Sequence, residues 1–133
     1  MKAIARHPAM LVGSDAVFAA TPHPRLCGTA SRFLGSYAIR DGIVTVREAI
    51  DRLSFRPARR VGLKDRGAIA PGQRADLVTF DPDRVIDRAT YEEPELPPSG
   101  IDWVIVGGAV AVDADGPTGA RCGGVARMND PRI

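Results

Sequence analysis

The chain has 133 residues, of which 44% are hydrophobic and 26% charged, a balance typical of a soluble globular protein with one core. Its net charge of +2 comes from scattered arginines, and aromatic residues make up only 5%, which argues against a nucleic-acid-binding surface. No apolar stretch approaches the ~20 residues of a membrane helix, and residues 1–6 hold no export-signal core, so we expect a cytoplasmic protein with no membrane partner.

Residues that usually bind metals are scarce. The only two histidines, His7 and His23, each precede a proline, and the sequence has no His-x-His, HExxH or Cys-x-x-Cys motif. Cys27 and Cys122 stand alone, which fits two reduced thiols in buried or half-buried positions. By itself, the chain is not expected to form an ordinary histidine-rich metal site.

The first half begins with a short helical end over residues 1–7, which a proline stops. Residues 9–12 are apolar without polar alternation, a pattern that predicts a short strand buried on both faces. Asp15 lies just beyond the carboxyl end of this predicted strand, the edge that carries the chemistry in α/β barrels. Asp15 is therefore a candidate general base, and the alternative is that it only caps a turn or the next helix.

A proline-punctuated loop is expected over residues 17–26, followed by a helix. The predicted helix begins near Thr29, which is a plausible N-cap residue, and ends near Arg40. Gly42 is then placed where a glycine commonly ends a helix.

A second helix is predicted from Thr45, because Thr45 and Glu48 have the spacing of a capping box. Its apolar residues recur at helical spacing and predict one buried face: Val46, Ala49, Ile50 and Leu53. A further short turn is predicted over residues 57–62, with Val61 and Leu63 facing inward.

The second half is rich in turn signals and β-forming residues. Residues 76–81 predict a strand, and residues 83–100, which contain three prolines, predict irregular structure. Residues 103–112 predict a hairpin, because two β-rich runs flank a Gly-Gly pair. Residues 113–133 predict a loose strand or an extended arm.

A boundary near residue 63 therefore separates a helical half from a β-rich half. Neither half accounts for a complete domain, because a strand buried on both faces needs neighbours on both sides and a few short strands are marginal alone. We expect the chain to be the last piece of a larger protein.

Short motifs follow one another along the chain in a distinctive order. The first half contains Gly13-Ser14-Asp15, His23-Pro24-Arg25, Gly28-Thr29 and Arg32-Phe33-Leu34-Gly35. The second half contains Asp65-Arg66-Gly67, Pro71-Gly72, Ala75-Asp76-Leu77-Val78 and Phe80-Asp81-Pro82. Over essentially the whole chain this order resembles the C-terminal third of the N-acyl-D-amino-acid deacylases (D-aminoacylases), a branch of the metal-dependent amidohydrolases. The first two motifs point to the deacylase branch, because the segment near Asp76 is shared by many amidohydrolases.

The resemblance implies an α/β fold in two parts. Residues 1–63 would be the C-terminal end of a metal-dependent amidohydrolase barrel, a (β/α)₈ TIM barrel, with its last strand and the helices after it. Residues 64–133 would be the C-terminal portion of a small β-sandwich that both chain ends build.

The resemblance also implies a reaction, the hydrolysis of a carbon–nitrogen bond other than a peptide bond. In the family a zinc ion activates water, and the aspartate after the last strand moves a proton from that water to the leaving amine. Asp15 matches this aspartate. The zinc ligands are expected from an N-terminal part of the barrel, with none from this chain. That part and a small-molecule N-acyl amino acid are the expected partners, and the chain alone is expected to be inactive.

Three further residues are candidate substrate contacts. Arg25 could bind the substrate's carboxylate through two hydrogen bonds, or it could pair with a structural acid or a helix end. His23 follows in the same loop, where a packed loop histidine is the alternative. Ser14 could contact the substrate or satisfy backbone groups at the strand end.

Two other functions stay open at this point. One is the tail of a cyclic-amide hydrolase, hydantoinase-like or dihydroorotase-like, since those enzymes also use an aspartate after the last strand. The other is a non-catalytic module that completes a separate chain of a split enzyme. The sequence departs from the deacylase pattern at Gly107, where the family usually has asparagine, and above all in its length.

Overall fold

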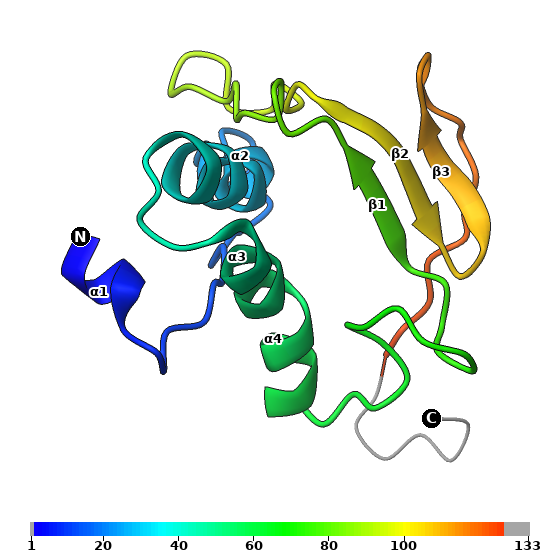
Figure 1. Cartoon of the computed structure of the whole chain (residues 1–133). Helices are drawn as coiled ribbons and strands as arrows, with labels where there is room; N and C mark the ends of the chain where they lie inside the picture. The colour runs from blue at the N-terminus through cyan, green and yellow to red at the C-terminus, as the bar shows by residue number, and fades with distance from the viewer. Residues whose placement is uncertain (1, 127–133) are drawn as a thin grey trace.

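A computed structural model describes residues 2–126 of the chain (Figure 1). The first half is helical: α1 Lys2–Arg6, α2 Arg25–Ser31, the π-helical segment η1 Arg32–Arg40, α3 Val46–Leu53 and α4 Phe55–Arg60. The second half contains four strands: β1 Leu77–Phe80, β2 Ile101–Val106, β3 Ala109–Asp113 and β4 Gly116–Pro117. These strands form one antiparallel sheet in the order β1-β2-β3-β4, beside the helices in Figure 1. None of the helices within residues 2–126 is long and apolar enough to cross a bilayer.

Residues 9–12 do not form the predicted strand. The Val12 amide donates to the Arg52 carbonyl oxygen at 3.2 Å, and the Met10 amide donates to the His7 carbonyl oxygen at 3.0 Å. A strand needs a neighbouring strand to share its hydrogen bonds, and the Val12 amide bonds to a residue of α3 instead. The apolar residues of this segment are still partly buried, because Met10 and Val12 pack against the core.

The helix predicted from Thr29 begins earlier, at Arg25. Thr29 is therefore not an N-cap, and its hydroxyl instead donates to the Arg25 carbonyl oxygen at 2.8 Å. The side chain that serves the start of α2 is His23, whose Nδ1 accepts from the Arg25 amide at 3.0 Å. The predicted end is confirmed, because η1 stops at Arg40 and Gly42 follows with a φ of +58°.

The capping box at the start of α3 is confirmed. The Thr45 hydroxyl oxygen accepts from the Glu48 amide at 3.2 Å, and Glu48 Oε2 accepts from the Thr45 amide at 2.9 Å. Helix α4 begins two residues before Pro57 and ends at Arg60. Val61, the residue directly after α4, is half exposed rather than inward-facing.

The predicted buried face of α3 is only partly correct. Ala49 is completely buried and Leu53 is half-buried, whereas Val46 and Ile50 are exposed. Arg52 is buried instead, and its Nη1 donates to a backbone carbonyl oxygen of α1. The side of α3 that faces α1 and η1 is thus defined by these contacts and not by the apolar stripe.

The sheet confirms the strand predicted at 76–81 and the hairpin predicted at 103–112. β1 pairs Val78 with Val104, and Gly107 and Gly108 form the β2–β3 turn with φ of +58° and +87°. Asp76 Oδ1 accepts from the Gly107 amide at 2.7 Å and so fixes the turn to the start of β1. The tail predicted over residues 113–133 contains the short strand β4, and its residues 127–133 lie outside the described residues.

Charged residues tie the segment before β1 to the sheet. Arg66 Nη1 lies 3.4 Å from Asp76 Oδ2, and Arg66 Nε donates to Asp65 Oδ1 at 3.1 Å. The hydrogen bond from Arg66 lowers the pKa of Asp65, and the same contact raises the pKa of Arg66.

Residues 83–100 are irregular, as predicted, and run over the helices before they enter β2 (Figure 1). Val85 from this loop joins the buried core of the helical half, which is built mainly by Phe33, Leu34, Ala38, Ile43, Val44 and Ala49. Asp87 is almost buried, at 7% side-chain exposure, and accepts from Arg32 Nε at 2.8 Å. That hydrogen bond raises the pKa of Arg32 and holds the loop against η1.

Candidate functional site

Asp15 projects its carboxylate into solvent from an unusual backbone conformation. Its φ is +48°, the left-handed region, and no other non-glycine residue among those described has a positive φ. Its side chain is 87% exposed. Aspartate tolerates this region better than most residues, but the conformation still costs free energy. A strained backbone conformation at a residue with an exposed carboxylate is typical of a functional position.

Ser14 shapes the turn that carries Asp15. Its Oγ accepts from the Ala16 amide at 3.3 Å, across the aspartate. Ser14 is half-buried, and this contact fits the alternative in which it satisfies backbone groups.

Arg25 brings a guanidinium to the Asp15 carboxylate. Arg25 Nη2 lies 3.2 Å from Asp15 Oδ2, and the Arg25 side chain is 40% exposed. Its Nε is buried and donates to no acceptor, so the exposed end of the guanidinium is the part that a ligand could reach. An ion pair as exposed as this one contributes about 0–1 kcal/mol, so Asp15 can release Arg25 at little cost.

His23 lies behind Arg25 and uses both of its ring nitrogens. Nδ1 accepts from the Arg25 amide at 3.0 Å, and Nε2 lies 3.1 Å from the Tyr91 hydroxyl oxygen. The two aromatic rings meet edge to face, with centroids 5.2 Å apart. Both ring nitrogens of His23 thus have protein partners, while His23 itself is exposed and Tyr91 is 74% exposed. Sequence reasoning missed Tyr91, because it lies 68 positions away and carries no local motif.

The described residues do not fit a metal site by themselves. Within residues 2–126 no three His, Cys, Asp or Glu side chains are grouped so that they could hold a metal ion. The charge nearest to Asp15 is the Arg25 guanidinium, which repels a cation. Cys27 and Cys122 are both free and half-buried.

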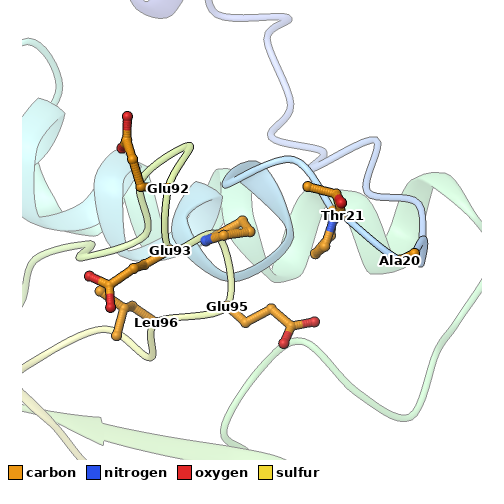
Figure 2. A pocket seen from close by; sticks show the side chains of 8 residues that line it. Ala20, Thr21, Glu92, Glu93, Glu95 and Leu96 are labelled. Atoms are coloured by element: carbon orange, nitrogen blue, oxygen red, sulfur yellow. The ribbon is translucent and has the colours of Figure 1, made fainter.

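A hollow of about 480 Å³ lies next to the His23–Tyr91 contact, and Figure 2 shows its lining. Ala20 and Thr21 line one side, and the other side carries three carboxylates, from Glu92, Glu93 and Glu95. Three negative charges disfavour an anionic ligand at this hollow, whereas Arg25 brings a positive charge to Asp15.

Sequence comparison places this chain among enzymes with known activities. Residues 1–112 match the amidohydrolase family. An N-acyl-D-glutamate deacylase from Alcaligenes xylosoxydans xylosoxydans is 41% identical over 130 residues, which are 97% of this chain and 26% of the relative. A D-aminoacylase from the same organism is 40% identical over 116 residues, 86% of this chain and 24% of the relative. The chain thus spans about a quarter of the length of the curated relatives that it matches.

Solved structures share the fold of this segment. A D-aminoacylase studied for its binuclear metal centre superposes with a TM-score of 0.87 and 37% identity, over 92% of this chain and 26% of that one. An N-acyl-D-glutamate deacylase from Bordetella bronchiseptica was solved with zinc and a phosphonate that mimics the tetrahedral intermediate. It superposes with a TM-score of 0.84 and 44% identity, over 93% of this chain and 26% of that one. The chain belongs to the amidohydrolase family.

Proposed function

We propose that this chain is part of a zinc-dependent N-acyl-D-amino-acid deacylase, which hydrolyses the amide to a free D-amino acid and a carboxylate. The deacylase relatives match 86–97% of the chain. A dihydroorotase from Lactobacillus acidophilus is 34% identical over only 68 residues, 51% of the chain. The difference in coverage favours the deacylase over a cyclic-amide hydrolase.

The proposal gives the two parts of the chain different roles. Residues 1–63 would close the end of a barrel, with residues 9–12 as its last strand once the neighbouring strands are present. Residues 64–133 would contribute their antiparallel sheet to a β-sandwich. The zinc ligands would come from the part of the relatives that this chain does not span.

The observation that carries the proposal is the pair of Asp15 and Arg25, 3.2 Å apart. Asp15 presents an exposed carboxylate, which can take a proton from the attacking water and deliver it to the leaving amine. Arg25 presents a partly exposed guanidinium, which can bind the carboxylate of an N-acyl amino acid through two hydrogen bonds. Ser14 would hold the turn at Asp15 through the Ala16 amide.

The experiment that tests the proposal uses a hybrid enzyme. This chain replaces the matching segment of the N-acyl-D-glutamate deacylase, and release of D-glutamate is measured with zinc present. Asp15→Asn keeps the size and the backbone preference but removes the proton acceptor, so kcat is expected to fall ~10²- to 10⁴-fold.

The matched control is Asp115→Asn, which removes an exposed carboxylate from the β3–β4 turn and should leave kcat unchanged. If Asp15→Asn hybrids turn over substrate as fast as the parent hybrid, Asp15 is not the general base.

A further inference from the structure

A line of contacts runs from the 83–100 loop to the candidate site. Tyr91 meets His23 at 3.1 Å, His23 meets the Arg25 amide at 3.0 Å, and Arg25 meets Asp15 at 3.2 Å. We propose that Tyr91 and His23 are positioning residues for Arg25, so that the 83–100 loop tunes the affinity of the enzyme for the substrate's carboxylate. This inference rests on the proposed function, in which Arg25 binds that carboxylate.

The loop that carries Tyr91 is anchored close to α2 and η1. Asp87, four residues before Tyr91, accepts from Arg32 Nε at 2.8 Å and is almost buried. A β-carbon on Gly28 would lie 3.4 Å from the Asp87 Cβ, so the loop and α2 are in van der Waals contact. Within the loop, the Thr90 hydroxyl oxygen accepts from the Glu93 amide at 3.0 Å and shapes the turn at Tyr91.

The hydrogen-bond directions at His23 follow from its two partners. The Arg25 amide can only donate, so Nδ1 must be the accepting nitrogen. In the neutral ring Nε2 then carries the proton and donates to the Tyr91 hydroxyl oxygen. The Tyr91 hydroxyl oxygen can accept this hydrogen bond, and its edge-to-face contact restricts rotation of the His23 ring.

Arg25 depends on this support because it is the first residue of α2. Pro24 precedes it and provides no side-chain hydrogen bond, so His23 supplies the side-chain acceptor for the Arg25 amide. Loss of that acceptor would loosen the first turn and widen the range of guanidinium positions. A binding group that is less well held binds the substrate and the transition state more weakly to a similar extent. KM therefore rises while kcat changes little.

The first experiment needs no activity. Nitrogen resonances of ¹⁵N-labelled histidine are recorded for the full chain and report which ring nitrogen of His23 carries the proton. We expect a predominantly Nε2-protonated ring, and a shift of both His23 resonances in Tyr91→Phe. The control Tyr37→Phe alters the other tyrosine of the chain, whose ring packs on Phe33, and should leave His23 unchanged. His23 resonances that do not shift in Tyr91→Phe would overturn the inference.

The second experiment measures KM and kcat in the hybrid deacylase. Tyr91→Phe is expected to raise KM ~2- to 10-fold, the range for one lost hydrogen bond, with kcat nearly constant. His23→Asn keeps an acceptor near the position of Nδ1 and should raise KM less than His23→Ala does, a rescue that general loosening of the fold would not produce.

The KM values of these variants distinguish a failure of the positioning role from a failure of the proposed function. If Arg25→Lys raises KM but Tyr91→Phe and His23→Ala do not, the positioning role is wrong and the proposed function stands. If Arg25→Lys leaves KM unchanged, Arg25 does not bind the substrate, and both its proposed role and this inference fall.

Discussion

Two carboxylates in the first half show how local contacts set the role of a residue. Asp15 is exposed and meets one guanidinium, which leaves its oxygens accessible to a proton or a ligand. Glu48 is held in the capping box, where Oε2 accepts from both the amide and the hydroxyl of Thr45 at 2.9 Å. These hydrogen bonds, from the amide first and the hydroxyl second, lower the pKa of Glu48 below its ordinary value of 4.5.

The lowered pKa of Glu48 predicts a pH dependence of stability. The folded state holds this proton less tightly than the unfolded state, so the contribution of Glu48 is complete above the unfolded pKa and is lost as pH falls through the folded pKa. We expect the difference in unfolding free energy between the parent and Glu48→Gln to be largest above about pH 5 and to shrink below about pH 4.

Urea unfolding followed by circular dichroism at several pH values measures this difference. Glu95→Gln serves as the control, because Glu95 lies exposed on the 83–100 loop, outside any capping box. A difference for Glu48→Gln that stays constant across this pH range would contradict the predicted role of the carboxylate.

At the scale of elements, the 83–100 loop docks closely on η1. Gly35 in η1 lies so close to this loop that a β-carbon would overlap the Val85 carbonyl oxygen. Gly35→Ala must therefore push η1 and the loop apart, and we expect it to destabilise the chain by about 1–3 kcal/mol. The control is Gly123→Ala, where no atom lies within 4 Å of the added carbon. Equal urea midpoints for the two variants would mean that the loop does not dock on η1.

The elements that the sequence predicted correctly depend on neighbours within a few positions. The capping box joins Thr45 to Glu48, and the hairpin turns at a Gly-Gly pair. The errors concern distant partners: the burial of Arg52 depends on a carbonyl group 47 positions away. Residues 9–12 carry the composition of a strand, but composition does not supply the strand that must pair with them.

The same distinction holds for the candidate site. The motifs of Asp15 and Arg25 are close in sequence, and the structure brings the two side chains together. The sequence leaves the role of His23 open, because a histidine beside proline has no local pattern that separates packing from ligand binding; the structure adds its two protein partners. Tyr91 was not predicted, since it reaches His23 only through the course of the 83–100 loop.

At the scale of the whole molecule, the chain exposes apolar side chains on its helical half. Phe18 is 88% exposed, and Val46 and Ile50 on α3 are 37% and 44% exposed. In the proposed deacylase, elements outside the span of this chain would cover them, and would pair with residues 9–12. This arrangement is consistent with a chain that matches only about a quarter of each curated relative.

The isolated chain and the proposed enzyme are expected to differ in activity. Asp15 can move a proton, but residues 2–126 offer no three-residue cluster for the zinc found with a relative. We therefore expect the pure chain with added zinc to release no D-glutamate from an N-acyl-D-glutamate, while the hybrid deacylase does. The control is Asp15→Asn in both proteins, which should change only the hybrid. The contrary result is release of D-glutamate by the pure chain at a rate that rises with chain concentration and is lost in Asp15→Asn. That result would show that the chain's own residues complete the site.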